Sequence, residues 1–404
     1  MTDKLLAYRS DKLLAYRSEF PILATTTYLV SNSLGAMPRT VPERLADYVD
    51  QWAELGVRAW ARGWWEMPVT VGNEIAPLIG AGPGEIAMMA NVTSAHATVL
   101  SALDYTKPRD TIVMTELDFP SVRYVYDRLA TRLGARIVVV KSDDGIGVDA
   151  QRVIDSIDER TRLVSISHVL FRSAYVMDVD AICRAAHDAG ALVALDAFHA
   201  IGVIPVDVRQ SGADFVTGGV LKWLCGGPGA CFLYVAPGVR SAFEPAFTGW
   251  QAHARPFDFE PEMDYAPDVF RWLNGTPVIP ALYAAIEGPR IVRRAGVEAI
   301  RAKSIRQTTR LIQLADDRGL HVHAPRDVAR RGGTVAIQVP HACEVSKALL
   351  ARDILVDYRP EAGIRIAPHF YTSDDELELS MSTIDEILER EEWRRFTGER
   401  TVVT

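Results

Sequence analysis

The sequence has little of what marks a membrane protein or a nucleic-acid-binding protein. No apolar run reaches the roughly 18 residues of a membrane-spanning helix. The formal net charge is −8, with acidic and basic residues interspersed, whereas proteins that bind nucleic acids carry a basic surface. Charged residues also occur throughout residues 1–20, unlike in a secretory signal peptide. We therefore expect no membrane and no nucleic acid among the partners.

Cysteine is scarce as well. The chain of 404 residues contains four, and their spacing matches no metal site: Cys183, Cys225, Cys231 and Cys343. In a chain this long they indicate reduced thiols rather than a disulfide framework. We expect a cytoplasmic protein without a bound metal.

Lysine is the third scarcity, with seven lysines among 44 basic residues. An isolated lysine is usually a solvated surface charge. Lys222, however, stands in the stretch GGVLKWLC, which is a poor setting for such a charge. The sequence therefore indicates a chemical role for Lys222.

An acidic residue upstream supports that interpretation. The apolar run Leu192–Leu195 predicts a buried parallel strand that ends at Asp196, and His199 follows three residues later. Lys222 comes about 26 residues after Asp196, beyond a second short strand. This arrangement is typical of enzymes that use pyridoxal phosphate (PLP), where the lysine forms a Schiff base and the carboxylate keeps the pyridine nitrogen protonated. For His199 two interpretations stay open, a residue at the cofactor or a core histidine bonded to backbone.

The hydrophobic pattern predicts an α/β fold. Short apolar strands alternate with amphipathic helices, which favours a mostly parallel sheet covered by helices on both faces. The expected strands are 85–90, 111–115, 135–140, 163–167, 192–195, 213–217 and 230–235, and the expected helices are 42–55, 69–79, 91–103, 121–133, 150–157 and 179–189.

The alternation stops after residue 235. Residues 248–268 are irregular, and a long helix follows, broken near Gly288-Pro289 and resumed to about residue 318. Strands at 334–339, 354–358 and 364–367 and helices at 344–351 and 374–391 then predict a small α+β unit. We expect a large cofactor-binding domain over 41–288, a small C-terminal domain over 289–404, and an N-terminal segment over 1–40 that joins the small domain.

One helix start is a candidate phosphate site. Asn91-Val92-Thr93-Ser94 opens the helix that follows the expected strand 85–90. Small polar residues at a helix N-terminus cap the helix, and the free N–H groups there also bind phosphate. Ligands of such sheets bind at the carboxyl ends of the strands, where Thr93, Phe119, Asp196 and Lys222 all lie.

Together these residues resemble kynureninase, within the class V aminotransferase group of fold type I PLP enzymes. The resemblance extends from about Phe20 to Glu391, and its markers include DFPSVRYVYD, LDAFHAIGVIPVDV, LKWLCGGPG, RWLNGTPVI and DYRPEAGIRIAPHFY. It implies a large domain with a mostly parallel seven-stranded sheet, a small α+β C-terminal domain, and a homodimer with shared active sites.

The resemblance also implies roles for single residues. Phe119 would stack on the pyridine ring, His199 would lie near the cofactor oxygens, and Arg365 would bind the α-carboxylate of an amino-acid substrate. The expected phosphate contacts are Val92, Thr93 and Ser94, with Trp250 and Thr276 from the partner subunit. The expected lining of the substrate pocket is Asn32, Ser33, Trp64 and His253.

Two residues depart from the kynureninase pattern. Leu221 stands where the pattern has Tyr before the lysine, and Val122 stands where it has Asp. Neither can donate a proton. We therefore expect a PLP enzyme acting at Cβ of an α-amino acid, with β-elimination of the C–S lyase type ahead of kynureninase-type hydrolysis. A decarboxylating, oxidative or aminotransferase reaction, and a PLP-fold binding protein without catalysis, remain alternatives.

The octapeptide DKLLAYRS occurs twice in tandem, at residues 3–10 and 11–18. Its period is too short for a fold repeat. We expect no functional role for the first copy.

Overall fold

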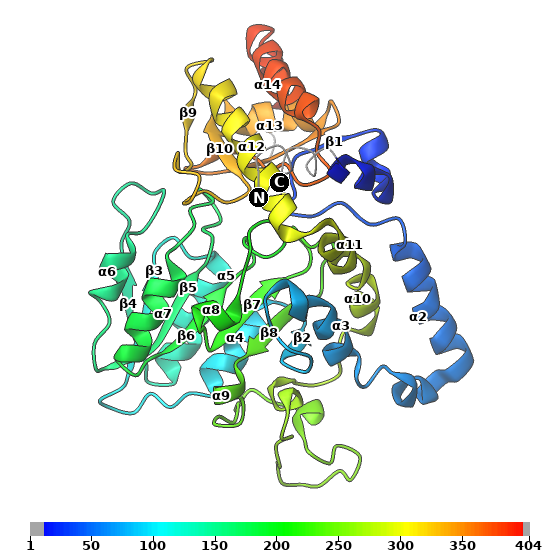
Figure 1. Cartoon of the computed structure of the whole chain (residues 1–404), viewed down its shortest axis with the longest axis vertical. Helices are drawn as coiled ribbons and strands as arrows, with labels where there is room; N and C mark the ends of the chain where they lie inside the picture. Colours follow the sequence, from blue (N-terminus) through cyan, green and yellow to red (C-terminus); the bar gives the residue numbers. More distant parts are fainter. Residues whose placement is uncertain (1–11, 399–404) are drawn as a thin grey trace.

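The computed structural model describes residues 12–398, so the first copy of the octapeptide lies outside the described residues. A seven-stranded sheet forms the lower body of the molecule in Figure 1, with strand order β2-β8-β7-β6-β5-β3-β4. Its strands are β2 (Ile86–Met89), β3 (Thr111–Thr115), β4 (Arg136–Val140), β5 (Thr161–Ser167), β6 (Leu192–Asp196), β7 (Phe215–Gly219) and β8 (Cys231–Val235).

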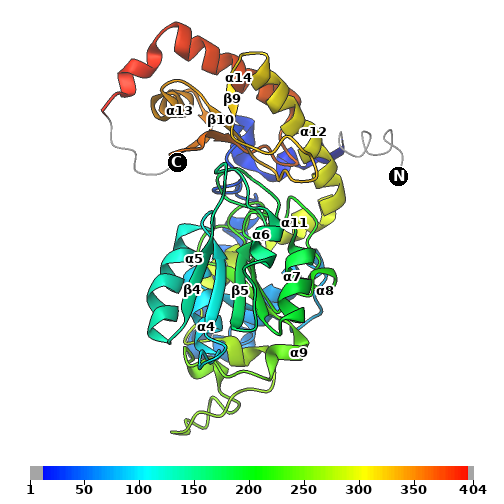
Figure 2. The ribbon, with the colours of Figure 1, turned by 90° about the vertical axis from the view of Figure 1, so that its left-hand side faces the viewer.

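β8 runs antiparallel to both of its neighbours, β2 and β7, whereas the pairs from β7 to β4 are all parallel. Every residue of β2, β3, β7 and β8 is buried, as expected for strands with helices on both faces. Figure 2 shows α4 and α5 on one side of the sheet and α7 and α8 on the other. The predicted α/β class with a mostly parallel seven-stranded sheet is confirmed.

The helices of this body follow the predicted alternation. They are α2 (Val41–Leu55), α3 (Met67–Ile75), α4 (Val92–Ser101), α5 (Pro120–Val125), α6 (Ala150–Ile154), α7 (Val179–Asp188), α8 (Val208–Ser211), α9 (Pro237–Arg240), α10 (Ile279–Ala284) and α11 (Glu287–Ala295). Among residues 12–398, none of the helices combines the length and apolar character that crossing a bilayer requires.

The long helix is broken at residues 285–286, close to the expected position near Gly288-Pro289. Gly288 and Pro289 fall in the first turn of α11, where proline is tolerated because the first N–H groups of a helix have no intrahelical partner. The break therefore separates α10 from α11, and a second break follows at Gly296, whose φ of 85° ends α11 before α12 begins.

A smaller unit lies above the sheet in Figure 1 and has its own apolar core. It is built from α12 (Val297–Asp316), β9 (His321–Val322), β10 (Val335–Gln338), α13 (Ala342–Leu350), β11 (Ile354–Leu355), β12 (Asp357–Arg359), β13 (Gly363–Ile366) and α14 (Asp374–Glu389). Four of its strands form a sheet in the order β12-β13-β10-β9.

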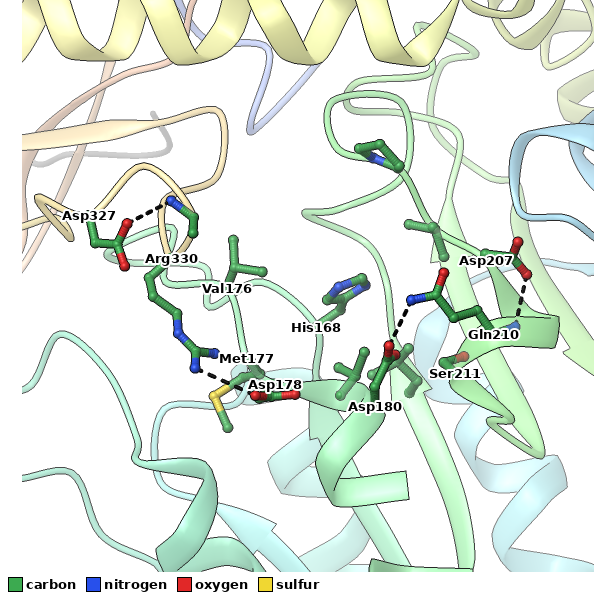
Figure 3. A pocket seen from close by; sticks show the side chains of 15 residues that line it. His168, Val176, Met177, Asp178, Asp180, Asp207, Gln210, Ser211, Asp327 and Arg330 are labelled. Atoms are coloured by element: carbon green, nitrogen blue, oxygen red, sulfur yellow. Dashed lines mark hydrogen bonds and ion pairs between the residues drawn. The ribbon is translucent and has the colours of Figure 1, made fainter. Parts of the chain in front are cut away.

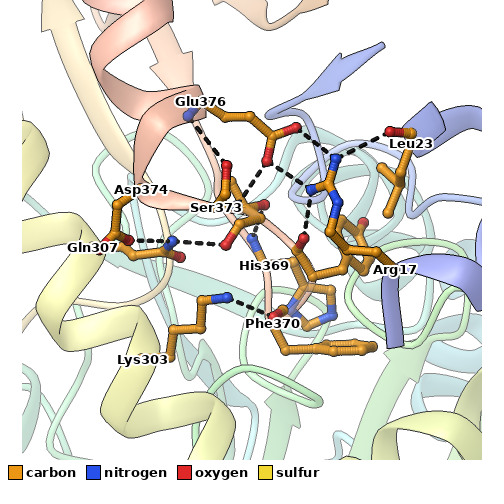
Figure 4. A network of polar contacts seen from close by, with 11 residues as sticks. Arg17, Leu23, Lys303, Gln307, His369, Phe370, Ser373, Asp374 and Glu376 are labelled. Carbon is orange, nitrogen blue, oxygen red and sulfur yellow. Dashed lines mark hydrogen bonds and ion pairs between the residues drawn. The ribbon is translucent and has the colours of Figure 1, made fainter. Parts of the chain in front are cut away.

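The N-terminal segment is attached to this smaller unit. β1 (Thr27–Tyr28) pairs in parallel with β11. Arg17, from the second copy of the octapeptide, donates to Glu376 at the start of α14 at 2.7 Å and to the Tyr371 carbonyl at 2.7 Å (Figure 4). These contacts agree with the expected placement of the segment, while the domain boundaries at residues 40 and 288 stay predictions.

Candidate active site

Asp196 ends β6 as the sequence predicts, and it is buried. Its Oδ1 accepts a hydrogen bond from the backbone N–H of Phe198 at 2.9 Å. Burial raises the pKa of this carboxyl to about 6, and the Phe198 N–H and Lys222 oppose that rise. Asp196 is therefore a carboxylate that a nearby cationic N–H would stabilise.

Lys222 lies in the turn after β7, and its Nζ is 2.6 Å from His199 Nε2. The amine also lies 5.3 Å from the centre of the Phe119 ring and 5.5 Å from that of Phe198. Burial lowers the pKa of Lys222 to about 7, although Asp196 opposes the shift. Burial also holds the pKa of His199 well below its usual value. The site thus places an amine that is partly neutral near pH 7, and so able to act as a nucleophile, against a neutral imidazole.

Phe198 is a site residue that the sequence did not reveal. Its ring fits beside Lys222 because residue 219 is glycine: a Cβ at Gly219 would overlap the Phe198 ring. The Gly218-Gly219 pair at the end of a strand was the available signal, since glycine in a strand often marks a close approach.

Phe119 is positioned by its neighbour Asp118, a second residue that the sequence did not reveal. The buried Asp118 carboxylate accepts from Thr115 N at the end of β3, at 2.8 Å, and from Ser167 N at the end of β5, at 2.9 Å. It therefore fixes two strand ends and the turn that carries Phe119. The Phe119 ring meets Phe171 edge to face, at 5.3 Å between ring centres.

The predicted phosphate site forms the start of α4. Asn91 and Ser94 make a reciprocal capping box there. Thr93 is exposed in the first turn, where N–H groups have no intrahelical partner. Ser94 and Thr276 line the same cavity of about 100 Å³. The side chain of Val92 is buried, so only its backbone N–H could bind an anion.

Arg365 lies in β13, directly opposite Asp357 in β12. Its Nε donates to Asp357 Oδ1 at 2.7 Å, its Nη2 pairs with Oδ2, and its Nη1 donates to the Phe171 carbonyl. Arg359 lies 3.3 Å from the same carboxylate. A guanidinium has five N–H bonds, so one remains on each terminal nitrogen of Arg365, enough to bind a carboxylate at two points.

The N-terminal segment reaches the lysine turn. Gly35 N donates to the Leu221 carbonyl at 2.7 Å, and a Cβ at Gly35 would overlap the Lys222 carbonyl oxygen. Asn32, in the turn before, is fully buried, and neither atom of its amide has a hydrogen-bond partner among the described residues. Buried amides are rarely left unpaired, so the Asn32 amide has unused hydrogen-bonding capacity next to the lysine turn. Ser33 follows it and is partly exposed.

Three predicted residues do not join the Lys222 cluster within the chain. Trp64 stacks on Tyr48 at 5.4 Å and donates to the Tyr283 hydroxyl. Trp250 and His253 lie in the irregular segment 248–268, which projects at the bottom of Figure 1. His253 Nε2 lies 3.1 Å from the Glu262 carbonyl.

PLP fits these residues. Lys222 offers a buried neutral amine to the aldehyde, and Asp196 offers a buried carboxylate to the ring nitrogen. Phe119 offers an aromatic face to the ring, and the start of α4 offers N–H groups to the phosphate. The unpaired Asn32 and the free N–H groups of Arg365 add polar contacts for an amino acid.

The chain is similar in sequence to known enzymes. Kynureninase from Burkholderia pseudomallei (strain 1106a) is 31% identical over 389 residues, which cover 93% of this chain and 92% of that one. Kynureninase from Pseudomonas fluorescens is 31% identical over 390 residues, with the same coverage of both chains.

Solved structures share the fold. A cysteine desulfurase from Thermococcus onnurineus NA1 superposes with a TM-score of 0.82 at 23% identity, covering 93% of this chain and 98% of that one. A cystine C–S lyase in complex with cysteine persulfide superposes with a TM-score of 0.82 at 21% identity, covering 90% and 98%. The family model described as aminotransferase class V matches residues 27–359. The chain therefore belongs to the aminotransferase class V family, which confirms the predicted group of PLP-dependent enzymes.

Proposed function

We propose that this protein is a PLP-dependent lyase that eliminates a substituent, such as a thiol, from Cβ of an α-amino acid. The observation that carries the proposal is the buried Lys222 amine, 2.6 Å from His199 and enclosed by Phe119 and Phe198. When bound, PLP supplies an electron sink for the charge left at Cα.

Residues of the chain bind the substrate and transfer the protons. Arg365 binds the substrate carboxylate through its two unused N–H bonds and thereby orients the Cα–H bond. Lys222 removes the Cα proton as a base, and the neutral His199 beside it accepts or returns a proton at Nζ. The sulfur leaves Cβ as a thiolate with the bonding electrons and takes up the proton that was removed from Cα. The aminoacrylate that remains tautomerises to an imine and, with one water, hydrolyses to pyruvate and ammonia.

The surroundings of the site support elimination over hydrolysis. Val122 is buried in an apolar cluster that includes Tyr126, and Leu221 is partly buried. Hydrolysis of a γ-carbonyl needs groups that place protons on the hydrated carbonyl, and losing a positioned general acid costs about 10²–10⁴-fold in rate. Elimination of a thiol does not need those groups.

Product analysis by mass spectrometry, with S-substituted cysteines, alanine and kynurenines as substrates, tests the proposal. We expect pyruvate, ammonia and a thiol from S-substituted cysteines, and none of them from a Lys222→Ala variant. Substrate consumed without pyruvate, or pyruvate formed equally by the variant, would contradict the proposal.

Kynureninase-type hydrolysis is the second candidate, because the kynureninase relatives match nearly the whole chain. We expect little anthranilate release from kynurenine, followed by fluorescence, and a gain in the Leu221→Tyr, Val122→Asp double variant. Turnover of kynurenine near ~1 s⁻¹ by the unmodified protein, a typical enzyme rate, would favour this candidate instead.

We also propose a homodimer with shared active sites, in which Trp250 and Thr276 contact the phosphate in the partner subunit. An aromatic surface supports it: Trp65, Trp250, Phe257 and Phe259 line an open cavity of about 470 Å³. Phe259 is 75% exposed, and Val57 beside it is 82% exposed. Contiguous exposed apolar patches of this kind mark protein interfaces.

A further inference from the structure

A second cavity, of about 610 Å³, lies beside the carboxyl ends of β5 and β6. Its walls come from the residues leading into α7, from α8, and from the loop 327–330 between β9 and β10 (Figure 3). Lys222, Asp196 and His199 are not among the described residues that line this cavity. Leu195 and His168 line it, however, so it lies directly behind the strand that carries Asp196.

The cavity carries an excess of negative charge. Its charged lining consists of Asp178, Asp180, Asp207, Asp327 and Arg330. Arg330 lies 3.5 Å from Asp178 and offsets one of the four carboxylates. The charge of the other three is not balanced by a cation in the lining, so the cavity attracts a positively charged ligand.

The three remaining carboxylates each use one oxygen for a bond within the protein. Asp180 Oδ2 accepts from Gln210 Nε2 at 2.8 Å. Asp207 Oδ1 accepts from the Arg209 N–H at 2.8 Å, and Asp327 Oδ1 from the Ala329 N–H at 2.9 Å. A carboxylate has about four acceptor positions on its two oxygens, so each keeps capacity for a ligand.

His168 is an independent sign of a ligand. Its ring is 92% buried and lies between Val176 and Asp180 in Figure 3, and neither ring nitrogen has a hydrogen-bond partner among the described residues. Burial lowers the pKa of His168 to about 4, so the imidazole is neutral near neutral pH and one nitrogen is an acceptor. Nδ1 has almost no accessible surface, so Nε2 is the nitrogen to which a ligand in the cavity would donate.

The spacing of the carboxylates decides the class of cation. No three His, Cys, Asp or Glu side chains between residues 12 and 398 converge closely enough to hold a metal ion. Asp327 lies at one end of the view in Figure 3 and Asp207 at the other, with Val176 and Met177 among the apolar lining. We propose that this cavity binds a linear organic cation with two or more ammonium groups joined by methylene chains, a diamine or a polyamine.

Calorimetric titration of spermidine into the purified full-length protein tests this site. We expect one saturable site per chain at physiological salt, and a rise in the unfolding temperature, since a ligand that binds only the folded state stabilises it. An Asp180→Asn, Asp327→Asn double variant should bind about tenfold more weakly or worse, because charge-assisted hydrogen bonds are lost. The control variant Asp50→Asn, Glu54→Gln removes the same charge from exposed positions of α2 and should bind as the unmodified protein does.

A ligand series keeps the test decisive if the double variant does not fold. Affinity should fall from spermidine to putrescine, and butanediol, which has the length of putrescine without its charge, should not bind. Equal loss of affinity in the control variant, or equal displacement of spermidine by magnesium ions at the same ionic strength, would show diffuse charge attraction and overturn the proposal. Failure of spermidine to bind at all would overturn it as well.

Discussion

At the scale of single residues, Lys222 is the group whose surroundings change its chemistry most clearly. We expect the apoprotein to become yellow with PLP and to bleach with borohydride, leaving the reduced adduct on Lys222. Because burial lowers the pKa of Lys222 to about 7, the neutral amine predominates above that pH. The rate of colour formation should therefore rise as the pH increases through about 7 and then level off.

Lys303 is a matched control for this prediction. It too is buried, and burial lowers its pKa to about 8, but its Nζ donates to the Phe370 carbonyl at 2.7 Å. Lys303→Met should keep the colour, whereas Lys222→Ala should abolish it. Peptide mapping that finds the adduct on Lys303, or on any lysine other than Lys222, would refute the assignment.

Arg365 carries the second prediction. Arg365→Lys keeps the charge but loses the planar fork, so substrate affinity should fall ten- to a hundredfold, on the order of 1.5–3 kcal/mol. Asp357→Asn should weaken substrate binding less, because it loosens the guanidinium without removing it. Equilibrium binding of the amino acid measures both effects. PLP affinity should be nearly unchanged, and loss of PLP would show that Arg365 serves the cofactor or the fold.

The sequence predicted the residues that chemistry requires but not those that position them. Asp196, His199 and Lys222 could be found because acid, strand and lysine follow one another within a short segment. Asp118 binds the backbone at the ends of β3 and β5, and Phe198 packs against Lys222. No periodicity in the sequence indicates such contacts. Asp357 lies opposite Arg365 only through the register of β12 and β13, which the sequence leaves undefined.

At the scale of elements, the strands of the central sheet were predicted well because strands buried on both faces are short continuous apolar runs. β3 coincides with its predicted range, and β4 differs by one residue. The two-residue strand β9 was missed, since so short a segment has no pattern. The helix break near Gly288-Pro289 was predicted to within three residues, although the proline itself lies in the first turn of α11 and not at the break.

The prediction at this scale concerns Arg17, which links the N-terminal segment to the start of α14. Its guanidinium contacts Glu376 and the carbonyls of Leu23 and Tyr371, and its side chain is 29% exposed. Arg17→Ala should lower the free energy of unfolding by about 1–3 kcal/mol, measured by urea denaturation. Arg394→Ala breaks an exposed ion pair with Glu391 and should change stability little. Equal effects of the two variants would mean that the N-terminal segment contributes no more than a surface ion pair.

At the scale of the whole molecule, several polar and aromatic side chains remain exposed on the surface of the single chain. Thr276 is exposed beside Ser94, and Trp250 packs with Trp65 and Phe257 on an open surface. Exposed aromatic side chains are unfavourable in water, and a second copy of the chain would cover them. The sequence indicates these residues only through the family resemblance, because an interface between subunits, such as the one we propose, leaves no pattern within one chain.

Complementation tests whether the active sites are shared. A Lys222→Ala chain lacks the amine, and a Trp250→Ala, Thr276→Ala chain lacks the contacts proposed to reach the partner subunit. Each homodimer should be inactive or nearly so, since both of its sites lack one part. In a mixed dimer, one site combines both defects and the other has neither, so up to half of the normal activity per dimer should return. Mixing Lys222→Ala with Asp196→Ala is the control, because both defects lie in the same set of contacts within one chain and no sound site can form. No recovery in the first mixture, after subunit exchange has been verified by mass spectrometry, would show that each chain builds its site alone. Recovery in the control would show instead that Lys222 and Asp196 of one site come from different chains.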